Sequence, residues 1–345
     1  MRSIFDLEIN ELEDFLISNS YKKYQASQVF DWLYKKRVTS FFDMSNISKE
    51  LRELLNSNFT IYDMKVKRHQ SSSLTHKYLY ELHDGAFIEA VLMEHDYGKS
   101  VCVSSEVGCN MGCVFCESGR LKKQRNLNPS EMVQSIMIIE NDLNVKVNSV
   151  VVMGIGEPFD NYDNVVKFIK IINNPKCLEI GARHITVSTC GIVPKIEEFS
   201  NLPFQVNLAI SLHAPNNELR SKIMPINRAY NLNELINCLK MYIEKTNRRV
   251  TIEYVMIDNV NDSVSLALEL ANLLKGMNVY VNLIPYNETN HLELKKTNKE
   301  KIMKFYDTLK KQGINVTIRK EFGGSIDAAC GQLRSSEVNK WKHFI

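Results

Sequence analysis

The chain has 345 residues, of which 44% are hydrophobic and 24% charged, and its formal net charge is +3. This length and composition support a buried core large enough for one barrel-sized domain and a small accessory domain. Charged side chains interrupt the first fifteen residues, where an export signal would need an unbroken apolar segment, among them Arg2, Asp6, Glu8 and Glu11. No window approaches the roughly 20 apolar residues that cross a bilayer. We therefore expect a cytoplasmic monomer without membrane association.

The positive charges are clustered, although the net charge is too small to establish a nucleic-acid partner. The clusters are Lys22-Lys23, Lys35-Lys36-Arg37, Lys65 with Lys67-Arg68, Lys122-Lys123 with Arg125, and Arg248-Arg249. Local cationic surface of this kind can bind phosphates even on a nearly neutral protein. Each cluster can equally be an ordinary solvated surface, and the sequence leaves both interpretations open.

The first hundred residues change from a helical to a β pattern. Apolar residues at spacings of three and four over 7–58 predict helices, and residues 1–60 are interpreted as a helical accessory domain. Over 74–93 the period shortens, and Asp84-Gly85 separates two apolar runs, which indicates a β-hairpin. We expect residues 61–97 to form a hairpin linker between this domain and the rest of the chain.

Residues 98–345 alternate between short β-rich runs and helical patterns. The expected strands lie near 101–104, 149–153, 184–188, 206–211, 251–256, 280–284 and 315–318. The expected helices lie at 129–140, 165–172, 232–244, 265–274 and 298–312. This alternation predicts an α/β fold with right-handed βαβ units, in the form of a partial (β/α)6 TIM-type barrel. In such a barrel, ligands bind at the carboxyl ends of the strands.

Eight cysteines in a cytoplasmic chain do not indicate a disulfide framework, so each is interpreted separately. Cys177, Cys190 and Cys238 stand alone beside apolar neighbours and resemble core residues. Cys109, Cys113 and Cys116 form a C-x3-C-x2-C motif. Three thiolates would leave one iron of a [4Fe–4S] cluster open to a small molecule. The alternative is a structural zinc site, but such a site requires four ligands, and no second closely spaced pair of Cys or His residues follows the motif.

Several polar residues occur where predicted strands end. Gly156 and Glu157 follow the run at 149–153, and they combine a close-approach turn with a carboxylate acceptor. Ser188, Ser211, His213 and Asn287 lie at or just beyond the ends of other predicted strands. Taken alone, such residues are more often turns and caps than ligand contacts.

The triad, with Phe115 before its third cysteine, resembles the radical S-adenosylmethionine (SAM) superfamily. Within it, the chain resembles the RlmN/Cfr family of rRNA adenine methyltransferases over nearly its whole length. The shared stretches are Cys102-Val-Ser-Ser-Glu-Val-Gly-Cys109, Met153-Gly-Ile-Gly-Glu-Pro158, Ser188-Thr-Cys-Gly-Ile-Val-Pro194, Ser211-Leu-His213, Met224-Pro-Ile-Asn227, Val281-Asn-Leu-Ile-Pro-Tyr-Asn287 and Ile326-Asp-Ala-Ala-Cys-Gly-Gln-Leu333.

The resemblance implies cofactors, partners and a reaction. The cofactors would be a [4Fe–4S] cluster on the three cysteines and two SAM molecules per turnover, with a one-electron donor such as flavodoxin or ferredoxin. The substrate would be an adenine of 23S rRNA, methylated at C2, with tRNA as a further candidate substrate and residues 1–60 as an RNA-binding domain. Two alternatives remain: a Cfr-like C8 methyltransferase that gives antibiotic resistance, and a zinc-stabilised RNA-binding protein.

The resemblance also assigns roles to individual residues. The SAM contacts would be Gly156, Glu157, Ser188, Ser211, Leu212, His213 and Asn287. Cys330, in the C-terminal catalytic segment, would accept a methyl group as S-methylcysteine, and Cys102 would release the product by forming a disulfide with Cys330. Glu89 is the one carboxylate in the apolar run 87–93, and a buried acid there suits proton transfer. By resemblance, Glu89 is the family's proposed base.

Overall fold

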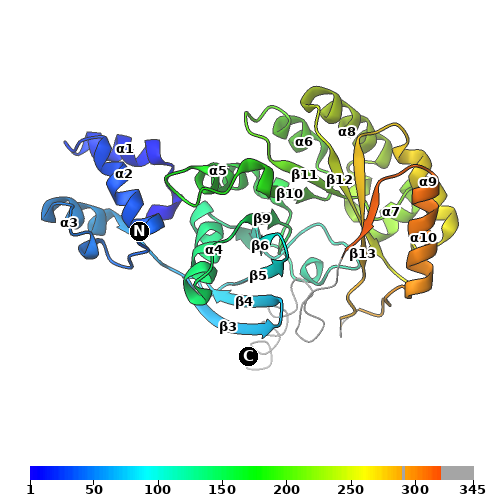
Figure 1. Ribbon diagram of the computed structural model, residues 1–345, viewed down its shortest axis with the longest axis horizontal. Coiled ribbons are helices and arrows are strands. Elements are labelled where there is room, and N and C mark those ends of the chain that lie inside the picture. Colours follow the sequence, from blue (N-terminus) through cyan, green and yellow to red (C-terminus); the bar gives the residue numbers. More distant parts are fainter. Residues whose placement is uncertain (290–291, 320–345) are drawn as a thin grey trace.

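The computed structural model describes residues 1–289 and 292–319, which form a helical region and an α/β body built on one large mixed sheet (Figure 1). The ten strands of this sheet lie in the order β14-β13-β12-β11-β10-β9-β6-β5-β4-β3. Among the helices in these two ranges, none is long and apolar enough to cross a membrane.

The helical region lies at one end of the molecule (Figure 1). Its elements are β1 (Arg2–Ser3), α1 (Ile9–Ser18), α2 (Tyr24–Phe30), a π-helical turn (Asp31–Lys35), α3 (Lys49–Asn58) and β2 (Phe59–Thr60), which pairs with β1 in parallel. Leu12 and Leu16 of α1 are buried, as are Leu51 and Leu55 of α3, because a spacing of four places each pair on one helix face. The helical pattern predicted for residues 7–58 is therefore confirmed.

Four antiparallel strands follow: β3 (Lys65–Ser72), β4 (Thr75–Glu81), β5 (Phe87–His95) and β6 (Gly98–Val103). The hairpin expected over 74–93 is formed by β4 and β5, and Gly85 turns the chain with φ of +78°. The outer strand β3 is an addition that the sequence pattern did not indicate. The strands β3 to β6 are hydrogen-bonded into the same sheet as the parallel strands. The domain boundaries expected at residues 60 and 97 stay predictions.

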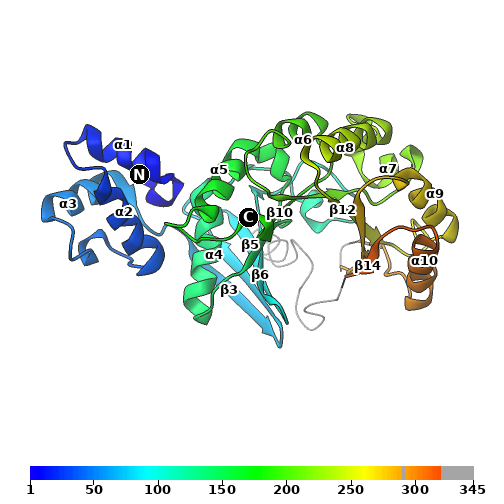
Figure 2. The ribbon, with the colours of Figure 1, turned by 45° about the horizontal axis from the view of Figure 1, so that its top comes forward.

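From β6 onward every neighbouring pair in the sheet is parallel. The strands are β9 (Ser149–Val152), β10 (Ile185–Thr189), β11 (Asn207–Ser211), β12 (Val250–Met256), β13 (Val279–Pro285) and β14 (Val316–Ile318). The sheet curves, and the helices between its strands lie outside the curve (Figure 2). All seven parallel strands therefore direct their carboxyl ends to one edge of the sheet.

The helices of the body begin at residues suited to capping. They are α4 (Pro129–Leu143), α5 (Tyr162–Asn173), α6 (Val193–Phe199), α7 (Asn217–Ile223), α8 (Leu232–Thr246), α9 (Val264–Leu274) and α10 (Lys299–Lys311). Asn128 and Asn231 form capping boxes with Glu131 and Glu234, which satisfies backbone N–H groups in the first turn. The short helices α6 and α7 were not predicted, because seven residues give too little periodicity to detect.

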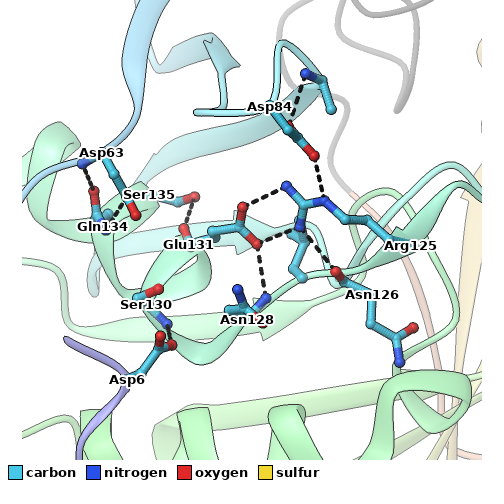
Figure 3. A network of polar contacts seen from close by, with 12 residues as sticks. Asp6, Asp63, Asp84, Arg125, Asn126, Asn128, Ser130, Glu131, Gln134 and Ser135 are labelled. Atoms are coloured by element: carbon cyan, nitrogen blue, oxygen red, sulfur yellow. Dashed lines mark hydrogen bonds and ion pairs between the residues drawn. The ribbon is translucent and has the colours of Figure 1, made fainter. Parts of the chain in front are cut away.

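The first turns of α4 hold the helical region against the body (Figure 3). The Ser130 N–H donates to Asp6 at 2.9 Å, and Gln134 Nε2 donates to Asp63 at 2.7 Å. Near the far end of α4, Arg37 is paired with the buried Glu140. These contacts join segments that lie more than seventy residues apart in the chain.

The first turn of α4 also holds Arg125, in the segment that follows the cysteine motif. Both terminal nitrogens of the Arg125 guanidinium, Nη1 and Nη2, donate to the Glu131 carboxylate at 2.8 Å, and Arg125 Nε donates to Asp84 in the β4–β5 turn at 2.7 Å (Figure 3). Bidentate arginine–carboxylate pairs are strong and directional. Arg125 therefore ties the hairpin to α4, and part of one basic cluster is structural.

Other basic clusters also contribute to internal contacts. Lys123 pairs with the buried Glu106 at 2.6 Å, and Arg248 donates to the carbonyl oxygens of Gln205 and Val206. In the cluster at residues 35–37, Lys35 and Lys36 are exposed, whereas Arg37 is largely buried against Glu140. Phosphate binding by this cluster can thus involve only its first two residues without disturbing the packing.

We expect Arg37→Met to lower the free energy of unfolding by about 2 kcal/mol, because it removes the closer cation of the buried Glu140 carboxylate and leaves Lys146, at 3.9 Å, as its partner. Lys35→Met is the matched control, since Lys35 is exposed and pairs with Asp31 on the surface. Its effect should stay within about 0.5 kcal/mol. Urea denaturation of the two variants measures both values, and equal effects would contradict a structural role for Arg37.

Candidate functional site

The three cysteines of the motif lie in one loop between β7 (Glu106–Val107) and β8 (Arg125–Asn126), at the carboxyl side of β6. The Cys109 N–H donates to the Leu121 carbonyl at 3.0 Å, and the Cys116 N–H donates to the Cys113 carbonyl at 3.2 Å. Cys109 is buried, and the other two are half-buried. The backbone of the loop is thus held, while two of its thiols remain accessible.

The three thiols lie within electrostatic reach of one another. Burial raises the pKa of Cys109 to about 12, and the neighbouring Cys116 adds to the shift. Burial also raises the pKa of Cys113, and Cys116 and Cys109 contribute in the same direction. Thiols in such surroundings become thiolates only when a cation is bound beside them.

As the side chains stand, the described residues contain no group of three His, Cys, Asp or Glu that could hold a metal ion. The chemistry of the donor set nevertheless fits a [4Fe–4S] cluster, because three free cysteines lie in one short loop and thiolate sulfur is the usual ligand of iron–sulfur clusters. Cys113 and Phe115 pack against Cys190, Ile223 and Met224. A cluster here would have three thiolate ligands and one open iron.

Gly156 and Glu157 lie in a turn after β9, and the backbone conformation at position 156 favours glycine. Gly156 has φ of +111°, and a Cβ on it would lie 2.6 Å from Cβ of Glu106. Glu157 is buried, and its two carboxylate oxygens accept from the N–H groups of Phe159 at 3.0 Å and Cys190 at 2.8 Å. Glu157 therefore joins the end of β9 to the end of β10, and burial raises its pKa.

Ser188 and Ser211 lie in neighbouring strands near the same edge. Ser188, in β10, is 5% exposed, and its hydroxyl has no hydrogen-bond partner among the residues that the structure describes. An unpartnered buried hydroxyl costs free energy unless a ligand satisfies it. Ser211 is half-buried at the last position of β11, and Leu212 after it is fully buried. The Ser188 hydroxyl is therefore available to accept a hydrogen bond from a ligand or to donate one to it.

His213 is buried just after β11, in a left-handed conformation with φ of +58°. Its Nδ1 accepts from the Val255 N–H at 3.0 Å, which places the proton of the neutral ring on Nε2. The Phe115 ring meets the imidazole edge to face, with centroids 4.8 Å apart. Burial, with a smaller contribution from the positive charge of Arg220, lowers the pKa of His213 to about 3. The ring is therefore a neutral donor beside the cysteine loop.

Arg220 of α7 is fully buried and was not singled out from the sequence. Its guanidinium donates to the carbonyl oxygens of Cys190 at 2.6 Å and Leu212 at 3.3 Å, and to Asn227 Oδ1 at 2.9 Å. It thereby fixes the chain beyond β10 and β11. No pattern in one sequence distinguishes such an arginine from a surface arginine on a short helix.

Cys102 and Glu89 occupy the antiparallel side of the site. Cys102 is half-buried in β6, and Glu89 is buried in β5, as expected for a proton-transfer group. Glu89 is paired with Lys77 of β4, whose Nζ lies 3.1 Å from its Oε2. Lys77 is fully buried. A single lysine in a β run does not indicate burial, so the sequence did not predict this residue as part of the site.

Two other predicted site residues stand apart from this group. Asn287 lies two residues beyond β13 and is exposed. Cys330, with the whole stretch from Ile326 to Leu333, lies outside the described residues. The structure therefore brings most of the predicted positions to one edge of the sheet, and the roles assigned to them stay predictions.

Comparisons with known proteins match both parts of the chain. Residues 103–271 match the radical SAM superfamily, and residues 3–61 match the ribosomal RNA large subunit methyltransferase N-terminal domain. The chain is 54% identical to the "Probable dual-specificity RNA methyltransferase RlmN" of Acholeplasma laidlawii, over 97% of this chain and 99% of that protein. It is 55% identical to the protein of the same name from Spiroplasma citri, over 97% of this chain and 98% of that protein.

A solved structure is also similar. The crystal structure of a radical SAM methyltransferase from Sphaerobacter thermophilus superposes with a TM-score of 0.92 and 40% sequence identity. The match covers 96% of this chain and 99% of that chain. The arrangement of helical region and mixed sheet described above is therefore shared with a protein of this class.

The buried neutral state of His213 predicts a pH dependence of stability. Between about pH 6.5 and pH 3 the unfolded chain binds a proton at His213 that the folded chain does not, so stability falls as the pH is lowered through this window. His213→Asn removes this contribution. Near pH 5, the slope of unfolding free energy against pH should therefore be smaller in the variant than in the unaltered protein, and the difference between the two slopes should be about 1.4 kcal/mol per pH unit. Asparagine tolerates the positive φ.

Urea denaturation at pH 6.5, 5.5 and 4.5 measures these slopes. His184→Asn is the matched control, since His184 is exposed and its loss should leave the slope unchanged. Parallel stability curves for His213→Asn and the unaltered protein would exclude a buried neutral His213.

Proposed function

This chain belongs to the RlmN family of radical SAM RNA methyltransferases, and on that basis we propose that it methylates C2 of an adenine in 23S rRNA and acts on tRNA as well. Two relatives that are more than half identical carry the description of dual-specificity RNA methyltransferases. The observation that carries the proposal is the loop of Cys109, Cys113 and Cys116 at the carboxyl edge of the sheet, the edge at which the buried Ser188 hydroxyl lacks a partner among the described residues.

In this proposal the three cysteines hold the [4Fe–4S] cluster, and the ends of the strands hold SAM. When bound, the cluster and two SAM molecules per turnover supply the methyl group and the means of hydrogen removal, with electrons from a flavodoxin or ferredoxin. Ser188 gives SAM a buried hydroxyl, and Gly156 allows close approach to the backbone. Glu157, Ser211, Leu212, His213 and Asn287 complete the proposed set.

Cys330, Glu89 and Cys102 would each carry out one step of the methyl transfer. An adenine C2 is a poor nucleophile, so Cys330 accepts the methyl group and delivers it to the base. Glu89 takes the proton that leaves the modified carbon, and Cys102 releases the RNA by forming a disulfide with Cys330. Burial of Glu89 at 3% exposure supports its part, because a proton acceptor there is protected from bulk water.

The finer architecture is part of the same proposal. Six strand–helix units, β6-α4, β9-α5, β10-α6, β11-α8, β12-α9 and β13-α10, would act as a partial (β/α)6 barrel whose carboxyl edge carries the chemistry. Residues 1–60 would present the RNA-binding surface, with Lys35 and Lys36 as exposed cations on it.

The alternative regiochemistry is methylation at C8, as in Cfr-like proteins. The relatives reported above are described as RlmN proteins, which favours C2. Liquid chromatography with mass spectrometry of nucleosides from treated 23S rRNA separates 2-methyladenosine from 8-methyladenosine. Detection of the 8-methyl product alone would overturn the C2 assignment.

Replacement of any one of Cys109, Cys113 and Cys116 by alanine is expected to abolish retention of the cluster, because two thiolates leave too few ligands. Iron and sulfide analysis after anaerobic reconstitution measures the loss. Cys238→Ala is the matched control, since Cys238 is buried in α8 with its thiol near the Val193 carbonyl of α6, and this variant should keep the full iron content. Full iron in a triad variant would refute the assignment, and zinc in place of iron would favour a structural zinc site.

Variants of the two cysteines that would handle the methyl group, Cys102 and Cys330, should fail at different stages. Cys102→Ala is expected to accumulate protein covalently bound to RNA, because methyl loading and addition need only Cys330 whereas release needs the second thiol. The adduct appears as a nuclease-sensitive shift on a denaturing gel. A variant that combines Cys102→Ala with Cys330→Ala should give no adduct. Normal turnover by Cys102→Ala would exclude the methylcysteine route.

A further inference from the structure

A fully buried ion pair lies on the antiparallel side of the site. Lys77 is 0% exposed, Glu89 is 3% exposed, and Lys77 Nζ is 3.1 Å from Glu89 Oε2. Lysine is almost never fully buried in proteins unless it is paired. Removing both charges from water costs several kcal/mol per ion, and a pair of this kind adds little to stability compared with apolar side chains. The pair is therefore better explained by chemistry at the site than by stability.

The strand register places this pair beside Cys102. Lys77 of β4 is opposite Val91 of β5, and Val91 is opposite Cys102 of β6. Since side chains alternate along a strand, Lys77, Glu89 and Cys102 lie on the same face of the sheet. Two strand spacings of about 4.8 Å separate the backbones of Lys77 and Cys102, and Glu89 is on the strand between them.

The charges around Cys102 act in opposite directions. Burial raises the pKa of the Cys102 thiol; Arg319 and Lys77 lower it, and Glu89 raises it. The charges with the largest effect on the thiol come from three strands or strand ends: Lys77 from β4, Glu89 from β5 and Arg319 just after β14. On the side of β9, the register partner of Cys102 is the apolar Val151.

We propose that Lys77 is a positioning residue that couples the proton on Glu89 to the thiolate state of Cys102. While Glu89 is a carboxylate, its negative charge offsets the ammonium of Lys77, and Cys102 keeps its proton. When Glu89 takes up a proton, this offset is removed, and the positive charges of Lys77 and Arg319 favour the thiolate of Cys102. The thiol then releases its proton to water and becomes a thiolate, with no electron transferred.

The inference rests on the proposed function, because it orders two of its steps. Proton uptake by Glu89 from the modified adenine would produce the Cys102 thiolate, which is the form that attacks sulfur. Cys102 would thus stay a thiol until the base has lost its proton, and it would attack the Cys330 sulfur only when the S–C bond can break with the methylated base as the leaving group. The buried pair is suited to this task because its charges are poorly screened by water.

The test is the pH profile of Cys102 alkylation in the full-length, reconstituted protein without SAM or RNA. Iodoacetamide is the probe, and mass spectrometry of the Cys102 peptide gives the rate between pH 6 and pH 10. Glu89→Gln mimics the protonated acid, so the midpoint should fall by about one pH unit and the rate below it should rise about tenfold. The combined Lys77→Met and Glu89→Gln variant should lose this gain.

Two further variants keep the test sharp. Glu94→Gln is the matched control, since Glu94 lies on the same strand, pairs with Lys99 and is half-exposed, and its loss should leave the midpoint unchanged. If Lys77→Met fails to fold, Lys77→Arg combined with Glu89→Gln retains a cation and should retain the lowered midpoint. An unchanged midpoint in Glu89→Gln, or the same gain without a cation at position 77, overturns the inference.

The outcome is independent of the proposed function, because alkylation requires no methyl transfer. A coupled pH profile in a protein that does not methylate RNA would leave the coupling intact and refute the reaction. RNA methylation with an uncoupled profile would refute only the role of Lys77.

Discussion

The carboxyl edge of the parallel sheet imposes the constraint on which the rest of the site depends. Where parallel strands end together, their backbone N–H and C=O groups lose their ladder partners while still buried, and each must be satisfied. Three side chains near this edge do this: Glu157 accepts from two N–H groups, Arg220 donates to carbonyl oxygens beyond β10 and β11, and His213 accepts from the Val255 N–H. The same residues thereby fix the loops that would meet the cofactors.

Because of this constraint, some side chains at the carboxyl edge that are proposed to bind a ligand also hold the backbone in place. Glu157 already makes two backbone hydrogen bonds, so any ligand contact would use its remaining lone pairs. Ser188 is different, because its buried hydroxyl is unpartnered within the described ranges. Of the polar residues on neighbouring strands, Ser188 therefore gives the more specific indication of a ligand.

Charge is used in this protein mainly to join distant segments. Arg125 ties the hairpin to α4, Arg37 ties the helical region to α4, and Lys123 holds Glu106 beside the cysteine loop. Lys77 and Glu89 extend this pattern to the interior of the sheet. A basic cluster in the sequence is therefore a poor guide to phosphate binding, because pairing with carboxylates from remote segments decides which cations stay available.

Periodicity and motif spacing are local, so the amino-acid sequence was enough to predict the long helices and most strands to within a few residues, the hairpin at Asp84-Gly85, and the family to which the cysteine triad belongs. Three features came only from the folded structure: β3–β5 continue the parallel sheet, Arg220 is buried, and Lys77 pairs with Glu89. These features depend on strand register and on contacts between distant residues, and no local pattern encodes either one.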